Sequence, residues 1–524
     1  MSEIKQTSQP ADSVKGEESG NFFIRLLQKH YGRVYLEKSE KQILREKYLI
    51  PNVISFNRWF LFPASVLLQF CCGSLYAWSV YNTPIDKYIY GYDAKMAPIT
   101  FYIAVGFFGF STAVMGPWLE RKGPLLSGLT GTSLFFLGNL LTGLALYVRQ
   151  IWLVYVGYGV IGGFGLGLCY ITPVSALQKW FPDKRGLGSG FAVCGFGAGS
   201  IVTALIPLPL ISAVDLPLTF VIMGSCFFVL MVLASSVLRT PPPGYIVNGL
   251  DIYENKQIVK PAPSLIELSL IDSLLSREFR LMYAVFFANA VFGLVVISRL
   301  SNMITDIFGQ PKEVAAQIVS VNGGFNLFGR LFFSILSDYV GRKWCYVIMI
   351  SFQLIILGCF STMLEHQAYW AFVVTMWILT ACYGGGFGVI PAFLTDMFGP
   401  SNIGACHGVI LTAWSLAGVG GGLVFTAVFN HLLAVGYTSK DLPPYTYNVW
   451  WIFAIVTIGW FTLFFLRVSL QDRLLPKKEG ELIRLRVATY VIRVYHKPGF
   501  KVEVLKKAQF DQEWQEYLTS KNNS

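Results

Sequence analysis

The amino-acid sequence predicts an all-α polytopic membrane protein with twelve transmembrane helices arranged as two six-helix halves. Only 14% of its 524 residues are charged, whereas soluble domains carry about 25% charged residues. Twelve apolar runs approach the roughly 20 residues that a membrane-spanning helix needs. Motifs among the first six runs recur among the last six at a fixed distance, which indicates an internal duplication.

The apolar runs divide the chain into five predicted parts. They lie near residues 60–82, 98–118, 125–147, 151–177, 187–211, 217–238, 280–304, 314–337, 344–364, 368–394, 405–433 and 449–468. No signal-cleavage site follows the first run, so it is predicted to remain as a span. The predicted parts are an N-terminal tail (1–58), a first six-helix half (59–238), a linker (239–279), a second six-helix half (280–468) and a C-terminal tail (469–524).

The distribution of lysine and arginine predicts the orientation in the membrane. If the N-terminus faces the cytoplasm, the inner segments hold 34 of these residues and the outer segments hold 6. Membrane proteins generally carry their excess of basic residues on the cytoplasmic side. Both tails and the linker are therefore predicted to be cytoplasmic. The net charge of +11 then follows from topology and attraction to anionic lipid, and no nucleic-acid partner is needed. The plasma membrane is the expected location, with an organelle membrane as the alternative.

The loops after the second and the eighth spans carry the same pattern. One constant offset in the numbering relates Glu120 to Asp338, Gly123 to Gly341, Pro173 to Pro391 and Gly190 to Gly408. An acid at a helix end, followed by a glycine turn with basic residues, can latch neighbouring helices while two halves rock. The predicted gating residues are Glu120, Arg121, Asp338 and Arg342. The alternative for a single copy is a solvated turn that carries basic charge.

Several other features predict packing rather than chemistry. The glycine-rich stretches from Gly163 and from Gly195 lie inside spans with no preceding strand, so they favour helix packing over a dinucleotide site. The nine cysteines lie in spans or near cytoplasmic ends, which predicts free thiols and no metal site. His407 opens the eleventh span, where a solvated helix-end histidine is favoured over a proton shuttle. Residues 22–50 and the tail from Arg484 alternate basic and apolar residues, as interfacial helices do.

Longer stretches carry a family resemblance. They are Trp180–Gly186 (WFPDKRG), Pro241–Tyr245 (PPPGY), Cys382–Phe387 (CYGGGF), Ile390–Phe393 (IPAF) and Ile410–Gly418 (ILTAWSLAG). Together with the two loops they resemble the major facilitator superfamily, and within it the oxalate–formate antiporter family, which is related to the monocarboxylate transporters. The resemblance covers roughly residues 58–468. It implies a facilitator fold with a substrate site near mid-membrane between two halves that alternate access.

Arg330 is the one ionisable residue that sequence places well inside a span. It precedes Asp338, at the end of the eighth span, by eight residues, which is roughly 12 Å along a helix. A charge at mid-bilayer costs at least about 3 kcal/mol and marks functional sites. The planar guanidinium matches a carboxylate, so Arg330 is the residue predicted to bind an anionic substrate. The alternative is an arginine satisfied by backbone carbonyls within the bundle.

The resemblance implies further site residues. In the related transporters an arginine at the position of Arg330 binds the substrate carboxylate, and aromatic site positions match Tyr76, Tyr170 and Tyr383. The second cation of the oxalate site is replaced here by Trp414, which favours a monocarboxylate, because an unpaired second carboxylate in a dry site is costly. Asn326 stands where the monocarboxylate transporters have an acid, so proton coupling through that acid is not predicted.

The sequence therefore predicts a secondary transporter of a small organic anion, most simply a pyruvate-, lactate- or formate-like monocarboxylate, as symporter or antiporter. The expected partners are this substrate and the bilayer, and the expected state is a monomer without cofactor or metal. One alternative is a carrier of an uncharged or larger solute with a structural Arg330. Another is a transport-like receptor. An enzyme is not predicted, since the spans show no paired carboxylates, no His-x-x-x-His and no Ser/His constellation.

Overall fold

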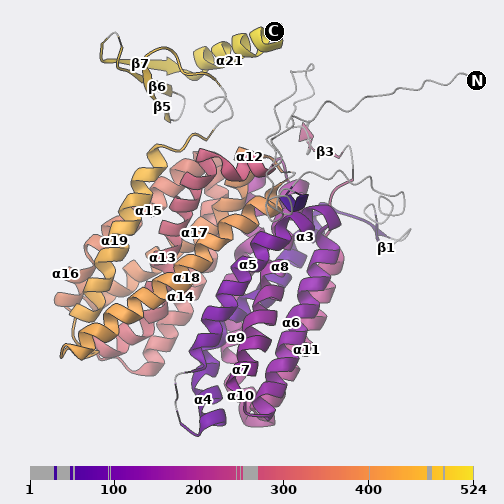
Figure 1. Ribbon diagram of the computed structural model, residues 1–524, viewed down its shortest axis with the longest axis vertical. Helices are drawn as coiled ribbons and strands as arrows, with labels where there is room; N and C mark the ends of the chain where they lie inside the picture. Colours follow the sequence, from indigo (N-terminus) through magenta and orange to yellow (C-terminus); the bar gives the residue numbers. More distant parts are fainter. Residues whose placement is uncertain are drawn as a thin grey trace, which may run out of the picture.

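The computed structural model places the two halves side by side as two helical bundles (Figure 1). It describes residues 29–31, 48–50, 54–92, 94, 96–242, 245–247, 250–251, 270–400, 402–468, 475–487, 490–497 and 499–522. In Figure 1 the N-terminal half is drawn in indigo to magenta and the C-terminal half in pink to orange.

The N-terminal half contains six spans, of which three are interrupted. The first passes from an α-helix into a long 3₁₀ segment, the fourth contains a π segment, and the fifth breaks before a proline. The elements are η1 (Arg58–Phe60), α3 (Leu61–Cys72), η2 (Gly73–Tyr81), α4 (Asn82–Tyr90), α5 (Pro98–Lys122), α6 (Pro124–Tyr147), α7 (Ile151–Val154), η3 (Tyr155–Gly162), α8 (Gly163–Trp180), α9 (Arg185–Leu205), α10 (Pro207–Val214) and α11 (Leu216–Val237). Segments of 3₁₀ or π geometry inside a helix often mark functional positions.

The C-terminal half repeats the arrangement with more continuous helices. Its elements are α12 (Leu270–Leu275), α13 (Arg277–Asp306), α14 (Lys312–Val340), α15 (Arg342–Gly358), α16 (Phe360–Glu365), α17 (Tyr369–Phe398), α18 (Ile403–Ala434) and α19 (Pro443–Phe464). Two short antiparallel hairpins lie outside the spans, one formed by β1 (Tyr48–Ile50) and β2 (Ile54–Ser55), the other by β3 (Ile246–Val247) and β4 (Leu250–Asp251).

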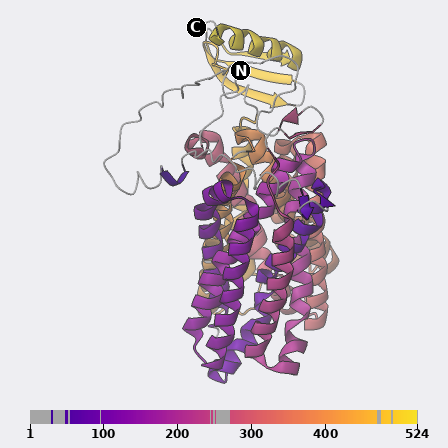
Figure 2. The ribbon, with the colours of Figure 1, turned by 90° about the vertical axis from the view of Figure 1, so that its right-hand side faces the viewer.

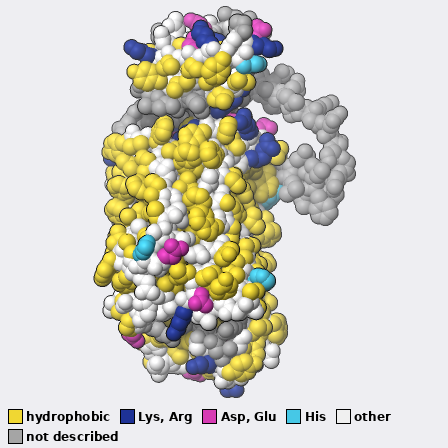
Figure 3. Space-filling view, turned by 90° about the vertical axis from the view of Figure 1, so that its left-hand side faces the viewer, with side chains coloured by type: hydrophobic (Ala, Val, Ile, Leu, Met, Phe, Trp, Pro, Cys, Tyr) yellow, Lys and Arg dark blue, Asp and Glu magenta, His cyan; other side chains and the backbone are white. Residues whose placement is uncertain are grey.

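The membrane-spanning prediction is confirmed by the lengths of these helices. Among the described residues, ten helical segments are long and apolar enough to cross a membrane. Helix α13 makes an eleventh when its two parts, Arg277–Leu294 and Arg299–Asp306, which meet at 41°, are taken as one span. The ninth predicted run, 344–364, coincides with α15 and α16, which are separated by a break at Cys359. Each of the twelve predicted runs thus lies on helical structure. Figure 3 shows apolar side chains over most of one face of the bundles, with a few charged side chains among them.

The duplicated loops end α5 and α14 in the same way. Gly123 follows α5 with φ +85°, and Gly341 follows α14 with φ +96°. Positive φ is favourable for glycine and strained for most other residues. The two loops therefore turn alike, as the repeat predicts. We call the end of the bundles where these loops lie the latch end; it is the upper end in Figure 1.

The halves meet along helices rich in small residues. Helix α5 packs against α18, and α9 packs against α14 and α17. Gly116 lies against the backbone of Ala405, and Gly408 against the carbonyl of Thr112, so that a side chain at either glycine would collide with the opposite helix. Small residues of this kind allow close helix contact within a membrane. Gly163 and Gly195 likewise lie against the backbone of Ala104 and Val66, which confirms the packing prediction for the glycine-rich stretches.

The tail from Arg484 forms strands followed by a helix, so the prediction of an interfacial helix there is wrong. Strands β5 (Glu481–Val487), β6 (Tyr490–Tyr495) and β7 (Lys501–Lys506) form an antiparallel sheet in that order, and α21 (Lys507–Asn522) follows. Val491, Phe510 and Trp514 belong to a small core of their own. This domain lies beyond the latch end (Figure 2). Of the other tail segment, 22–50, the structure describes three helical residues, 29–31, and the strand at 48–50; the rest lies outside the described residues.

Candidate functional site

Arg330 lies on α14 with its side chain enclosed between the two halves. The residue is 1% exposed. Its Nε donates a hydrogen bond to Oδ1 of Asn326, one turn earlier, over 2.9 Å, and its Nη1 donates to the carbonyl of Val193 on α9 over 2.9 Å. A guanidinium has five N–H donors. One backbone carbonyl thus accepts from the guanidinium, as the alternative interpretation of Arg330 predicts. The remaining N–H donors of the guanidinium are left for a ligand.

No carboxylate pairs with Arg330 among the residues that the structure describes. Instead, the guanidinium carbon lies 5.0 Å from the centre of the Phe387 ring and 5.4 Å from that of Phe196. Aromatic faces attract a cation, but they do not neutralise its charge. A buried charge normally has a charged partner, and the described residues supply none to Arg330.

Two of the predicted tyrosines meet across the interface of the halves. The hydroxyl of Tyr76, in the 3₁₀ segment η2, lies 3.1 Å from the hydroxyl of Tyr383 on α17. The indole Nε1 of Trp414 on α18 donates to the same Tyr383 hydroxyl over 3.1 Å. The Arg330 charge acts on both tyrosine hydroxyls. These residues therefore form one polar cluster in an aromatic enclosure.

Tyr170 lies on the N-terminal side of the same enclosure. It is buried on α8, and its hydroxyl has no hydrogen-bond partner among the described residues. The Arg330 charge reaches this hydroxyl as well. The structure thus brings together all six residues predicted for the substrate site, namely Arg330, Asn326, Tyr76, Tyr170, Tyr383 and Trp414.

Three phenylalanines complete the enclosure and were not predicted. Phe196 contacts the rings of Tyr76 and Tyr170, with centroids 4.8 Å and 5.6 Å away. Phe387 contacts Tyr383 at 5.2 Å, and Phe108 contacts Trp414 at 5.1 Å. Each of the three has a glycine as a neighbour in sequence, which is a weak signal for a ring at a close helix interface. Phe387 also ends the CYGGGF stretch, whereas nothing else distinguishes Phe108 and Phe196 among 42 phenylalanines.

At the latch end, Asp338 joins the C-terminal half to the N-terminal half. Its carboxylate accepts hydrogen bonds from the backbone N–H groups of Gly186, at 3.0 Å, and Leu187, at 3.3 Å, in the first turn of α9. Helix N-termini favour negative charge. Arg342 approaches the same carboxylate within 2.7 Å. Asp338 therefore connects the halves, while Arg342 supports it from within its own half.

A second connection at the latch end uses a residue that the sequence analysis missed. Asp396, near the end of α17, accepts from Arg185 of the N-terminal half over 2.7 Å and from Arg342 over 3.0 Å. The step in the numbering from Lys179 to Asp396 equals the step from Phe181 to Phe398. The repeat thus makes Asp396 equivalent to a residue of opposite charge, and it does not point to an acid at this position.

Glu120 makes the corresponding contact in the N-terminal half. Its Oε1 accepts from the backbone N–H of Gly404, at the start of α18, over 2.6 Å, and from Ser175 over 3.1 Å. Lys179 on α8 is bound to Oε2. The offset from Gly186 to Gly404 is the same as the offset from Glu120 to Asp338, so equivalent carboxylates bind equivalent helix N-termini in the two halves.

Arg121 contacts the N-terminal tail and not the other half. Its Nη1 donates to the carbonyl of His30 over 2.8 Å. His30 Nε2 lies 2.6 Å from the carbonyl of Val114, and Tyr31 donates to the carbonyl of Ala113 over 2.8 Å. Of the four predicted gating residues, Arg121 is thus the one that holds the tail against α5.

His407 is not a solvated helix-end histidine, and that expectation is wrong. It lies one turn into α18 and is 0% exposed. Neither ring nitrogen has a hydrogen-bond partner among the described residues. Its ring stacks on Tyr170, with centroids 6.0 Å apart and an angle of 26° between the planes. The close packing of α18 against α5, which the sequence does not show, excludes water from this position.

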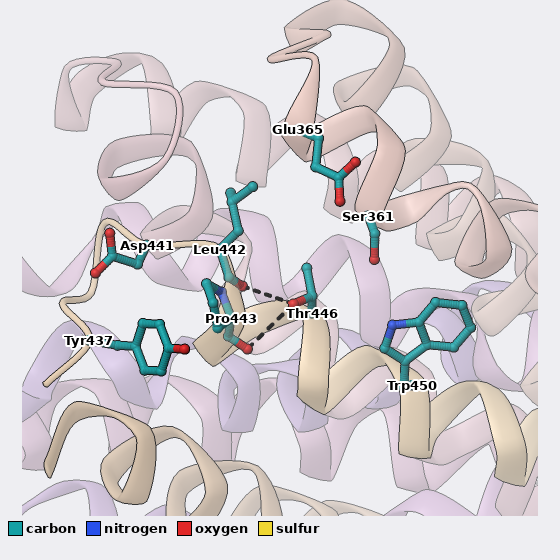
Figure 4. A pocket seen from close by; sticks show the side chains of 8 residues that line it. All are labelled: Ser361, Glu365, Tyr437, Asp441, Leu442, Pro443, Thr446 and Trp450. Carbon is teal, nitrogen blue, oxygen red and sulfur yellow. Dashed lines mark hydrogen bonds between the residues drawn. The ribbon is translucent and has the colours of Figure 1, made fainter. Parts of the chain in front are cut away.

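A separate open pocket of about 700 Å³ lies away from Arg330, between α16 and the start of α19 (Figure 4). Its lining includes Glu365, Asp441 and Trp450. Asp441 accepts hydrogen bonds from the backbone and the hydroxyl of Thr438. Its described lining has acidic groups and no cation, so the pocket does not offer the complement to an anion that Arg330 does.

Known proteins are similar to this chain in sequence and in fold. The sequence profile of the Major Facilitator Superfamily matches residues 53–422 and 281–521. The uncharacterized MFS-type transporter YhjX of Escherichia coli is 26% identical over 375 residues, which cover 71% of this chain and 88% of the relative. The oxalate:formate antiporter of Oxalobacter formigenes is 26% identical over 377 residues, covering 70% and 84%. The solved structure of the proton:xylose symporter XylE covers 78% of this chain and 96% of its own, with a TM-score of 0.58 at 13% identity.

Proposed function

The chain belongs to the major facilitator superfamily, and from that premise we propose that it carries a small organic anion, most simply a monocarboxylate, across a membrane. The observation that carries the proposal is the enclosed Arg330, which has no carboxylate partner among the described residues. A charge left unpaired in a membrane protein is costly, and such residues mark substrate pathways. An incoming carboxylate supplies the missing countercharge and a planar two-point acceptor for the guanidinium.

The other residues of the site favour one carboxylate over two. In the described part of the enclosure, Arg330 is the one cation, and Trp414 donates its N–H to Tyr383. The tyrosine hydroxyls can donate to carboxylate oxygens, while the rings supply apolar walls. A second carboxylate would meet aromatic rings without a cation, which is expensive. The relative that is an oxalate:formate antiporter supports carboxylates as the substrate class.

Alternating access is the proposed mechanism, with the latch end closed in this conformation. Asp338 and Glu120 each hold a helix N-terminus of the opposite half, and Asp396 adds an ion pair across the interface. Opening toward the latch end requires that these contacts separate together. We place this end and both tails in the cytoplasm, as the distribution of basic residues predicts, and we propose the five-part division of the chain given above.

Counterflow in proteoliposomes tests the function. Vesicles loaded with unlabelled pyruvate, lactate, formate or oxalate are diluted into a trace of the same labelled compound, with an uncharged solute, glucose, in parallel. We expect transient accumulation of one or more monocarboxylates by the wild-type protein and its loss in Arg330→Gln. Accumulation of glucose with Arg330→Gln unimpaired would assign the carrier to uncharged solutes. Substrate binding without accumulation would indicate a receptor.

A further inference from the structure

His407 is an enclosed titratable group that the anion site does not use. It is 0% exposed, and neither ring nitrogen has a hydrogen-bond partner in the described structure. Leaving a buried polar atom unpaired lowers the stability of the fold. A leucine or phenylalanine would fill such a position without that cost. We therefore expect the His407 ring to gain a hydrogen-bond partner in another state of the protein.

The neighbours of His407 connect it to Arg330 on one side. Its ring stacks on Tyr170, whose hydroxyl also lacks a partner among the described residues. Tyr170 and Arg330 in turn contact the same Phe196 ring, whose centroid lies 5.6 Å from that of Tyr170 and 5.4 Å from the guanidinium carbon, so the three residues form a continuous line from α18 through α8 to α14. A change of charge at either end of this line changes the electrostatic energy of the group at the other end, since interactions between charges are strong in a dry interior.

On the other side, His407 adjoins the latch. Gly404, one turn earlier on α18, donates its N–H to Glu120 over 2.6 Å. Titratable groups on other elements contact both parts of α18. Those against its first part are Glu120 from α5, Tyr170 from α8, Tyr76 from η2, Tyr283 from α13 and Tyr383 from α17. Those against its far part, from Gly422 onward, are Tyr102 from α5, Arg299 from α13 and Tyr445 from α19. Glu120 and Lys179 neutralise each other. Separation of Gly404 from Glu120 would move the α18 backbone one turn from His407 and would leave Glu120 paired with Lys179.

We propose that His407 is the proton-binding site of this carrier and that Tyr170 couples its protonation to anion binding at Arg330. The inference rests on the proposed function and adds the coupling ion. With the latch end closed, the ring is neutral and dry. When that end opens, water reaches the ring, and an exposed histidine titrates near pH 6.5. A proton from the solution binds the free ring nitrogen on one side of the membrane and returns to water on the other, so that one proton and one anion cross together without net charge.

The test uses the full-length protein in proteoliposomes with pyruvate as probe and the dye pyranine inside. Lactate and formate are measured in parallel. With the outside two pH units more acidic, we expect wild type to accumulate the anion by up to about a hundredfold for one proton per anion, with acidification of the lumen. His407→Gln should keep counterflow, which needs no net proton movement, and should lose the accumulation driven by the pH gradient. His431→Gln is the matched control, because His431 lies exposed in the last turn of the same helix.

The outcomes separate the inference from the proposed function. If wild type shows counterflow but no lumen acidification, the proton site is wrong while the carrier function stands, and this result needs no variant. If His407→Gln or His407→Asn still accumulates pyruvate on a pH gradient as wild type does, the proton site is not His407. If folded wild type moves none of the three carboxylates, the proposed function itself fails.

Discussion

The backbone N–H of Gly186 donates a hydrogen bond to Oδ1 of Asp338 over 3.0 Å and thereby ties the first turn of α9 to the end of α14 in the other half. A side chain at Gly186 would collide with this carboxylate. The same relationship joins Gly404 to Glu120 over 2.6 Å. Hydrogen bonds to a charged group contribute about 1.5–3 kcal/mol each, so the paired contacts are strong enough to hold one conformation and weak enough to separate during transport.

Asp338→Asn should slow transport without abolishing substrate binding. The amide keeps an acceptor for Gly186, but it loses the charge that attracts the α9 N-terminus and Arg342. The latch then closes less readily, while Arg330 is untouched. Turnover is measured by counterflow, and binding by the rise in melting temperature with added pyruvate. Asp441→Asn, at a half-buried acid in the loop between α18 and α19, is the control. Unchanged turnover in a well-expressed Asp338→Asn protein would count against the latch.

The C-terminal domain should be sensitive to acid. The Arg493 guanidinium is buried against Glu513, with 2.6 Å between Nη2 and Oε2. Partial burial alone would raise the pKa of Glu513, but hydrogen bonds from Arg493 and Lys478 hold that pKa below its ordinary value. A carboxyl group whose pKa is lowered by folding stabilises the fold above its unfolded pKa of about 4.3 and loses this contribution as the pH falls through the folded value.

Glu513→Gln should therefore destabilise this domain at neutral pH by roughly 2–3 kcal/mol and flatten its loss of stability in acid. Limited proteolysis of the full-length protein at pH 7 and pH 4, with cleavage mapped to residues 475–522, measures both effects. Glu516→Gln, at an exposed position on the same helix that pairs only with Gln512 among the described residues, should behave as wild type. Equal protease resistance of the two variants at pH 7 would contradict the prediction.

Cysteine labelling of intact cells tests the predicted topology. A single cysteine at Lys501, in the C-terminal domain, should resist a membrane-impermeant maleimide in sealed right-side-out cells and react after permeabilisation. A cysteine at Lys440, in a predicted outer loop, should react in both. Both positions are exposed in the structure, so burial does not account for a difference. Labelling of a cysteine at position 501 in sealed cells would show that the C-terminal domain faces outward, opposite to the predicted orientation.

The parts of the structure that the sequence predicted are those set by local pattern or by the repeat. Span length places the helices because each must cross the same apolar thickness. The constant offset between the two halves placed Glu120 and Asp338 in equivalent roles. The family resemblance selected Tyr76, Tyr170 and Tyr383 from 26 tyrosines, and the structure places the three around Arg330, although substrate binding by them stays a prediction.

The parts that were missed depend on contacts between distant segments. Asp396 pairs with Arg185 from the opposite half of the chain, and no local pattern shows that. The burial of His407 follows from the approach of α5 to α18. The C-terminal strands are a different case, because their alternation of apolar and polar residues has the period of two that is typical of strands. The sequence of this tail therefore indicates strands, in agreement with the sheet that it forms.

Arg330→Lys should weaken monocarboxylate transport although it keeps the charge. An ammonium cannot make the planar two-point contact, and it also gives up one of the two bonds, to Asn326 and Val193, that orient the guanidinium. The loss of one charge-assisted hydrogen bond, about 1.5–3 kcal/mol, corresponds to a roughly ten- to hundredfold lower affinity. Arg330→Gln should lose more, because the attraction between charges also disappears. If Arg330→Gln transports with the rate and affinity of wild type, the arginine is structural. The reason for proposing an organic anion as the substrate is then removed.

Trp414→Lys should shift the preference from monocarboxylates toward dicarboxylates. The indole is enclosed and its N–H reaches the Tyr383 hydroxyl, so a lysine ammonium from the same helix position enters the enclosure that holds Arg330. Two cations then face the two ends of oxalate, whose second carboxylate lacks a partner in the wild-type site. Loss of the indole costs packing, and a lysine in the membrane costs about 3 kcal/mol, so rates are normalised to inserted protein.

Trp414→Phe is the matched control, because it removes the N–H and adds no charge. The ratio of oxalate to pyruvate counterflow should rise in the lysine variant and not in the phenylalanine variant. An unchanged ratio in well-inserted Trp414→Lys would mean that position 414 does not face the second carboxylate, and the absence of a cation there would no longer explain a preference for monoanions.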